Sequence, residues 1–302
     1  MSDNEKLIEF ARFLKENGVE VNDDSAMKNA LSDYSTHKAQ IHLTKVLSHP
    51  QKEKALMYLE KSKAEYAMGN REEGERYLRI SRTLCPTCIE AEIFEAKKMD
   101  SKEGIVLLSS TLEREKTKLE AAGYQRSRYQ GHYFENEETQ RYLVALAGYA
   151  DLLFRNSKEL DAAALLEEVI TLGGSDRLRI VDQLILCLAF SHDIERAMYW
   201  FEKFDGMQHS SLLFALCSAL YMNGLMEEAA KMRSQILKNN THWKTFLLQD
   251  LETIFTMFSQ YELLSEHWVE GENSEVYHCF VTNIAVFSDY PEYWDFLQRY
   301  KI

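Results

Sequence analysis

The chain has 302 residues, of which 45% are hydrophobic and 12% aromatic, so it can bury a large core. Its 35 basic and 48 acidic residues give a formal net charge of −13, which repels phosphate backbones and anionic membranes and argues against nucleic acid and membranes as partners. Only three prolines and twelve glycines interrupt long stretches of good helix formers, and this composition favours an all-α fold.

The termini and the cysteines suggest an intracellular protein. The first ten residues contain acids and lack the apolar core of a signal peptide, and no run of about 18 apolar residues occurs. The five cysteines form an odd set, which does not favour a disulfide framework. We therefore expect a soluble, cytoplasmic protein.

The first 50 residues predict two helices. Apolar residues at helical spacing indicate a helix that ends at Gly18, and a second is expected from Ser25, as its N-cap, to about Leu47. We interpret residues 1–50 as an N-terminal helical cap.

From residue 51 the pattern becomes repetitive. In the segment 55–86 one helix is expected to end near Gly69 and a second to begin at about Arg71, and Pro86 closes the unit. The spacing of small and large side chains is typical of a tetratricopeptide repeat, in which small residues let two helices cross closely. The residues with this spacing are Tyr58, Ser62, Gly69, Gly74, Leu78, Ser81 and Pro86.

Three later segments, 143–174, 179–206 and 211–240, have apolar residues in the same phase. Their crossing residues are 35 and 32 residues apart, which suits a helix-turn-helix unit of about 34 residues. These crossing residues are Ala162, Ala197 and Ala229.

The remaining segments fit around these repeats. One irregular pair of helices is expected at 89–99 and 102–121, followed by the odd segment 123–143. Residues 51–241 would then be tetratricopeptide-like repeats, and apolar helices within 242–302, near 245–258, 274–287 and 292–300, would cap the last repeat. The sequence thus predicts one continuous α-α superhelix.

Four stretches also resemble bacterial relatives of the suppressor of tumorigenicity seven family. They are GHYFENEETQRYLVALAGYADLL (131–153), GGSDRLRI (173–180), NNTHWKTFLL (239–248) and GENSEVYHCFVTNIAVFSDYPEYWDFL (271–297). The likeness extends over roughly residues 51–297, and it implies scaffold-like binding in the bacterial cytoplasm without a catalytic residue set.

The chain departs from that family at several points. Arg141 stands where proline is expected, Gly173 and Gly174 stand where the family has Asn-Pro, and the membrane segments of the eukaryotic members are absent. These departures leave the repeat fold intact and argue against a membrane role.

The CPTC stretch at 85–88 leaves three interpretations open. Zinc needs four ligands, and one CxxC supplies two. Cys88 is expected just before a helix, whose dipole would lower the pKa of its thiol and allow redox chemistry with Cys85. Pro86 stands where a repeat closes, so a structural corner explains the motif without chemistry. We favour the corner, then a redox pair, then a metal site.

No other motif predicts catalysis. Glu275 and His278 share a helix face, as in di-iron bundles, but only one such pair is present, so we interpret His278 as a surface or cap residue. GxSxG, HExxH, P-loop and GxGxxG motifs do not occur. We expect no enzyme, no metal and no cofactor.

The segment 124–134 mixes aromatic residues with two arginines, which would suit packing, an acidic peptide or stacked bases. Packing is favoured, with the arginines paired to Glu135, Glu137 or Glu138. Peptide contact comes second and nucleic acid third. The secondary binding candidates in this segment are Arg126, Arg128 and His132.

The main binding candidates lie on the first helix of each pair, because those helices line the concave side of stacked repeats. Basic and aromatic side chains there suit an extended or helical peptide with acidic groups. The candidates are Lys63, Tyr66, Asp151, Phe154, Arg155, Arg179, Asp182, Phe190, Phe214, Ser218 and Tyr221. We expect a non-enzymatic protein- or peptide-binding scaffold. The alternatives are a peptide-sensing regulator acting through another protein, and a redox protein using Cys85 and Cys88.

Overall fold

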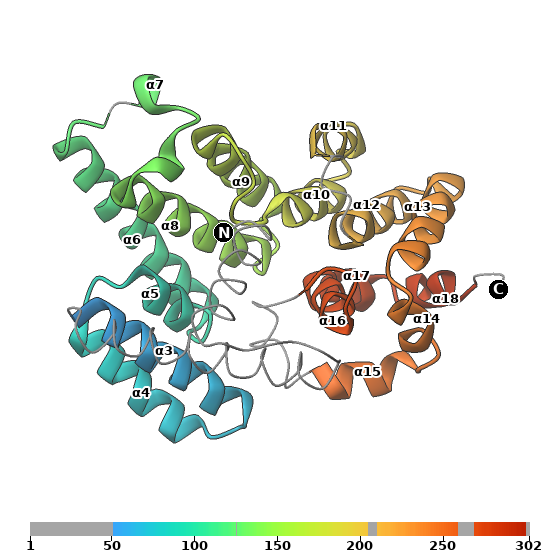
Figure 1. Cartoon of the computed structure of the whole chain (residues 1–302), viewed down its shortest axis with the longest axis horizontal. Helices are drawn as coiled ribbons and strands as arrows, with labels where there is room; N and C mark the ends of the chain where they lie inside the picture. The colour runs from blue at the N-terminus through green and yellow to red at the C-terminus, as the bar shows by residue number, and fades with distance from the viewer. Residues whose placement is uncertain (1–50, 125, 205–209, 259–268, 300–302) are drawn as a thin grey trace, which may run out of the picture.

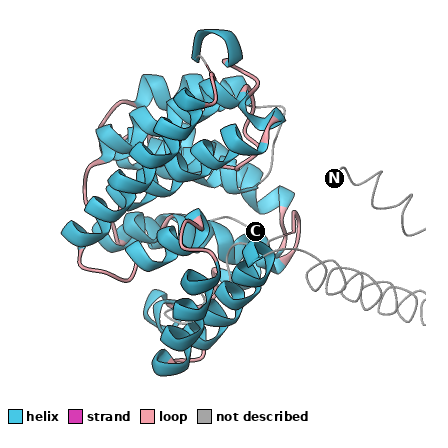
Figure 2. Ribbon diagram, turned by 90° about the vertical axis from the view of Figure 1, so that its left-hand side faces the viewer, coloured by secondary structure: helices cyan, strands magenta, loops and turns pink. Residues whose placement is uncertain are grey.

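The computed structural model describes residues 51–124, 126–204, 210–258 and 269–299. Within these ranges the chain forms sixteen α-helices and one 3-10 turn, with no strand, which confirms the all-α prediction (Figure 2). The two helices expected within residues 1–50 lie outside the described residues.

Ten of the helices form five consecutive pairs. The pairs are α3 (Gln51–Ala67) with α4 (Arg71–Leu84), α5 (Ile89–Ala96) with α6 (Ser101–Ala121), α8 (Glu137–Phe154) with α9 (Glu159–Gly173), α10 (Val181–Phe190) with α11 (Ile194–Phe204), and α12 (Ser210–Met222) with α13 (Met226–Asn239). The short α7 (Arg126–Tyr129) and the 3-10 turn η1 (Tyr133–Glu135) connect the second pair to the third. The expected helix pairs are therefore present, the irregular one included.

Four of the pairs turn in the same way. The residues at the turn, Gly69, Ser157, His192 and Gly224, have φ values of 80°, 54°, 58° and 76°. Each lies five residues before the buried small residue at the helix crossing. The amide that follows each turn residue donates to a carbonyl five residues earlier, at 2.8 to 3.0 Å. A left-handed residue at this fixed place ends the first helix and lets the second fold back along it.

The helices cross where the sequence places small residues. The Ser62 hydroxyl donates to the carbonyl of Gly74 at 2.7 Å, and the Cys217 thiol donates to the carbonyl of Ala229 at 3.4 Å. Both bonds join residues twelve positions apart. A Cβ atom on Gly74 would lie 2.7 Å from the ring of Tyr66, so a larger residue there would separate α3 from α4.

The pairs follow one another in an arc, and the chain then turns back into its inner side (Figure 1). The returning helices are α14 (His242–Phe246), α15 (Leu251–Phe258), α16 (Asn273–Thr282), α17 (Ile284–Asp289) and α18 (Glu292–Gln298). They are shorter than the three expected helices. Asp250 caps α15 by accepting the amide of Thr253, and Asn283 divides the expected helix 274–287 into α16 and α17.

A charged network joins the N-terminal helices. Glu92, on α5 and 2% exposed, accepts hydrogen bonds from Arg114 at 2.7 Å and from Thr111 at 2.9 Å, and it pairs with Arg82 at 2.9 Å. Glu115 on α6 pairs with Arg114 at 3.1 Å, with Lys118 at 2.7 Å and with Arg141 of α8 at 3.2 Å. The two carboxylates thus connect four helices, α4, α5, α6 and α8.

Arg141 joins α8 to the turn before α5. Besides Glu115, its guanidinium binds the carbonyl of Thr87 in the turn between α4 and α5 at 3.0 Å. A proline at position 141 would lack these bonds.

The two glycines at the end of α9 are required by close contacts. A Cβ on Gly173 would lie 2.3 Å from the Phe134 ring, and one on Gly174 would lie 2.4 Å from a backbone carbonyl oxygen.

Candidate functional site

The returning helices cover the C-terminal part of the predicted binding surface. Phe214 and Ser218 on α12 are fully buried. The Phe214 ring stacks on Trp243, with centroids 4.6 Å apart, and the Ser218 hydroxyl donates to the side-chain oxygen of Asn283 at 2.9 Å. The ring of Tyr221 lies 4.8 and 5.0 Å from two aromatic rings of α18. The expectation that these three residues line an open groove is wrong, because α12 binds the chain's own C-terminal helices with this face.

Asp182 on α10 is also enclosed. It is 5% exposed, its carboxylate accepts the amide of Gln183 at 2.8 Å, and it lies 3.6 Å from the imidazole Nε2 of His278 on α16. Glu275, one turn before His278, is fully buried and accepts the amides of Ser210 at 2.8 Å and Gly271 at 2.9 Å. Glu275 and His278 therefore join α16 to the start of α12 and to Asp182 of α10. Asp182 does not line an open surface.

The uncovered candidates gather around Asp151, near the end of α8. Its carboxylate lies 2.6 Å from the ammonium of Lys97 and 3.3 Å from the guanidinium of Arg155, and it accepts a hydrogen bond from Gln183 at 3.0 Å. Burial alone would raise the pKa of Asp151, but the charges of Lys97 and Arg155 outweigh it and lower the pKa. Helices α5, α8 and α10 thus meet at one ionised carboxylate.

An aromatic pair lies on α8 and α10, close in sequence to the ionic cluster around Asp151. Phe154 on α8 and Phe190 on α10 are both half-buried, and their rings meet edge to face with centroids 5.7 Å apart. Arg155, which follows Phe154, keeps 43% of its side chain exposed. We define the inner surface as Lys97, Lys98, Asp151, Phe154, Arg155 and Phe190.

Two further candidates lie on α3, beside the inner surface. The ammonium of Lys98 is 4.1 Å from the ring centroid of Tyr66 and 4.9 Å from that of Phe94, a cation–π arrangement. The Tyr66 hydroxyl donates to Glu75. Lys63 pairs with Glu60 at 3.1 Å, one turn earlier on the same helix. The structure thus joins Tyr66 to the Lys98 end of the inner surface.

Arg179 is exposed between α9 and α10 with φ of 53°, and its amide donates to the carbonyl of Asp176.

Lys97, Lys98 and Gln183 belong to this site but are not among the residues predicted from the sequence. The first two follow α5, whose pair was treated as irregular and was left out of the concave side. A pair of lysines immediately after a helix was the available signal.

The segment 124–134 packs through its aromatic residues. Tyr133 and Phe134 are buried, and Tyr124 meets Tyr129 edge to face at 5.1 Å. Arg126 pairs with Glu168 of α9 at 3.0 Å, so the expected pairing with Glu135, Glu137 or Glu138 is wrong for this arginine. His132 lies 2.7 Å from Glu135, and Arg128 lies over the ring of Tyr129. Arg128 and His132 thus contact neighbouring residues of the segment, whereas Arg126 joins it to α9.

The CPTC stretch forms a tight corner between α4 and α5. The amide of Cys88 donates to the carbonyl of Cys85 at 3.1 Å, and the Cys88 side chain is fully buried. Burial raises the pKa of the Cys88 thiol to about 12 and outweighs the hydrogen bond from the amide at the start of α5. The effect expected from the helix start is therefore present but too small to lower the net pKa, and the geometry favours the structural corner.

Within the described ranges, no group of three or more histidine, cysteine or acidic side chains is placed to hold a metal ion. In the same part of the chain, no helix combines the length and apolar character needed to cross a bilayer. No protein-family model matches the chain, and no curated protein matches it.

Proposed function

We propose that this chain is a non-enzymatic, tetratricopeptide-like scaffold of the bacterial cytoplasm that binds a protein or peptide at its inner surface. The proposal rests mainly on one observation. Where α8 and α10 meet the end of α5, the carboxylate of Asp151 pairs with the basic side chains of Lys97 and Arg155. The rings of Phe154 and Phe190 contact each other on the same two long helices, and all four side chains remain partly exposed.

The neighbouring part of the arc supports this proposal. There α12, which is the first helix of its pair, contacts α14 and α18 through aromatic rings, and its buried Ser218 hydroxyl binds Asn283 between α16 and α17. Helices at this position of a pair therefore suit the binding of another helix. The inner surface has the same kinds of side chain, but they are less buried. They are an aromatic pair and polar side chains whose positions are fixed by ion pairs.

Charge gives the partner its chemical character. Lys97 and Arg155 pair with Asp151, and Lys98 adds a third basic side chain to the inner surface, in a chain whose net charge is −13. Because Asp151 already has three partners, the local field of the inner surface favours acidic groups. A peptide with a few acidic residues and one apolar anchor against Phe154 and Phe190 fits this surface.

The test is a selection of peptides from a random phage-displayed library against the folded protein. We expect enrichment of acidic peptides, and loss of their binding in a variant that carries Lys98→Glu and Arg155→Glu. A variant with Lys102→Glu and Lys116→Glu, at two exposed positions on α6, is the matched control for the change in charge and should bind normally. Failure to enrich any peptide, or equal binding by the double variant, would contradict the proposal.

A further inference from the structure

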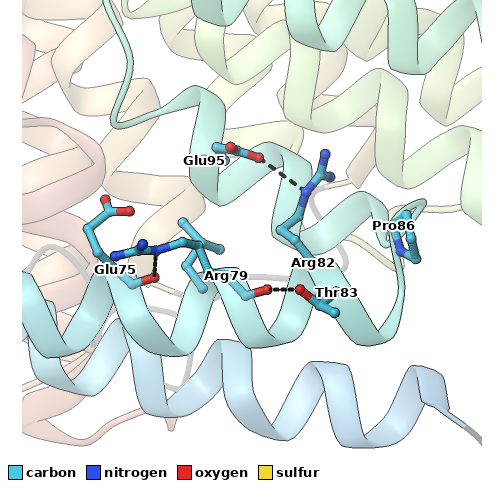
Figure 3. A pocket seen from close by; sticks show the side chains of 7 residues that line it. Glu75, Arg79, Arg82, Thr83, Pro86 and Glu95 are labelled. Atoms are coloured by element: carbon cyan, nitrogen blue, oxygen red, sulfur yellow. Dashed lines mark hydrogen bonds and ion pairs between the residues drawn. The ribbon is translucent and has the colours of Figure 1, made fainter.

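A pocket opens along α4, the second helix of its pair, and therefore on different residues from the inner surface (Figure 3). Its volume is about 370 Å³, enough for one or two side chains of a partner. Leu78, which is 3% exposed, and Pro86 form its apolar part. The pocket is lined by Glu75, Leu78, Arg79, Arg82, Thr83, Pro86 and Glu95.

Three of the four charged residues in the pocket are occupied by the protein itself. Arg82 pairs with Glu95 at 3.3 Å, and its other nitrogen lies 2.9 Å from the buried carboxylate of Glu92. Glu75 accepts the hydroxyl hydrogen of Tyr66. Glu75 thus has a hydrogen-bond donor and Glu95 has an ion-pair partner, and the guanidinium of Arg82 contacts the buried network of Glu92.

Arg79 differs from these residues. Its side chain is exposed, and its Nε donates only to the carbonyl of Glu75 at the long distance of 3.5 Å. No carboxylate in the described part of the chain forms an ion pair with it. Figure 3 shows its side chain lying along α4 between Glu75 and Thr83. A guanidinium in this state presents a planar set of donors that matches a carboxylate.

Thr83 adds an acceptor beside Arg79. Its hydroxyl donates to the carbonyl of Arg79 at 2.8 Å, which leaves the oxygen lone pairs for a peptide N–H. The pocket therefore combines the guanidinium of Arg79, the hydroxyl oxygen of Thr83 as an acceptor, and a small apolar area. The acids at its two ends, Glu75 and Glu95, disfavour a second negative charge.

We propose that this pocket binds the side-chain carboxylate of a single glutamate or aspartate in a partner peptide, with Arg79 as the ion-pair donor and a neighbouring apolar side chain against Leu78 and Pro86. The site is separate from the inner surface and does not depend on the function proposed for it.

The experiment follows the Arg79 Nε–Hε resonance by NMR during titration with three peptides. The first is acetyl-Gly-Glu-Leu-Gly-amide, the second has Gln in place of Glu, and the third is the Gln peptide with a free C-terminal carboxylate. The resonance is assigned by its absence in Arg79→Lys, a change at an exposed position, and a thermal melt shows that this variant is folded.

We expect a saturable shift with the Glu peptide and binding at least tenfold weaker for both Gln peptides. Arg79→Gln should weaken binding of the Glu peptide at least tenfold, measured on the amide resonance of Thr83, while Lys116→Gln leaves it unchanged. Equal binding of the Glu and blocked Gln peptides, binding of the free-carboxylate peptide alone, or unchanged binding by Arg79→Gln would overturn the proposal.

Discussion

The two ends of the arc are stabilised by different chemistry. From α8 to α18, one apolar cluster runs through the structure and contains most of the buried aromatic residues. From α3 to α5, a small separate cluster of Leu59, Leu78, Cys88, Ala91 and Phe94 suffices for the apolar contacts. The buried carboxylates Glu92 and Glu115 connect this end to α8. A third small cluster of Ala96, Leu108 and Leu152 adds apolar contacts among α5, α6 and α8. The N-terminal joint therefore combines buried charges with few apolar contacts, whereas the C-terminal part depends on the packing of large apolar side chains.

This difference also decides where a partner can bind. Helices α14 to α18 cover most of the inner face of α12. By contrast, Lys97, Lys98 and Arg155 of the inner surface and Arg79 of the α4 pocket remain exposed. Ion pairs fix the positions of polar side chains that are only partly buried, so this part of the surface is ordered and accessible to a partner. We expect truncation of a large side chain to destabilise the C-terminal part, and removal of a buried charge to destabilise the N-terminal joint.

The largest expected effect is at the aromatic stack of the C-terminal part. Phe214→Ala removes a fully buried ring that stacks on Trp243, and it should lower the free energy of unfolding by about 3–5 kcal/mol. Tyr199→Ala, at an exposed ring on α11, is the control and should change it by about 0.5 kcal/mol or less. Urea unfolding measures both. Equal effects would contradict the assignment of the core.

The next effect is at the charged joint. Glu92→Gln keeps the shape of the side chain but leaves Arg82 and Arg114 without their shared partner. We expect a loss of about 2–3 kcal/mol, below the value for a completely buried pair because both arginines are partly exposed. Glu60→Gln, which changes a carboxylate that is 62% exposed and paired with Lys63, should cost about 0.5 kcal/mol or less. A loss for Glu92→Gln no larger than that control would show that the network does not stabilise the joint.

The pH dependence should differ between the two parts as well. At the charged joint, burial would raise the pKa of Glu115, but its basic partners lower it to about 2. Its stabilisation is therefore complete above the unfolded value of about 4.5 and is lost as the pH falls through 2. In the turn before α10, burial and nearby Asp182 raise the pKa of Asp176 to about 7, although it accepts the amide of Ile180 at 2.7 Å.

For Asp176 the sign is opposite, because its folded pKa lies above the unfolded one. Its contribution is fully present below about pH 4 and is lost as the pH rises through 7. Asp176→Asn keeps an acceptor without the charge, so it should gain about 1–2 kcal/mol relative to the parent at pH 8 and nothing at pH 4, after allowance for partial exposure. Thermal melts at the two pH values check this. A difference that is independent of pH would contradict it.

The smallest effect is in the turns. His192→Gly relieves a left-handed backbone and should stabilise the protein by about 0.5–1 kcal/mol, whereas Gly224→Ala at the equivalent place should destabilise it by about 1 kcal/mol. Chemical denaturation of the two variants compares them. The same sign for both changes would argue against a shared turn.

The sequence predicts the helix pairs well because their crossings need small residues at fixed spacing, as at Ser62 and Gly74. It predicts the turns less well, because Ser157 and His192 adopt the conformation that glycine marks in the other two pairs. The position of the C-terminal helices could not be predicted. The contact between Phe214 and Trp243 depends on how the chain turns back, which no local pattern encodes.

The charged joint was missed for a related reason. An acid on a helix is normally solvated, and only its neighbours show otherwise. Glu92 lies among Ile89, Ile93 and Ala96, on the apolar side of its helix, and this was the available signal. The arginines that pair with it come from α4 and α6, and their arrival at this point is a property of the packing.

The inner face of α12 is covered by the chain's own helices, whereas we propose that the inner surface near Asp151 is open to a partner. Hydrogen–deuterium exchange, with and without an acidic peptide obtained by the phage selection, tests this most directly. We expect the peptide to slow exchange at residues 97–98 and 151–155 and to leave 210–222 unchanged, already slow in the free protein. Protection confined to 210–222, or fast exchange there without peptide, would contradict the account.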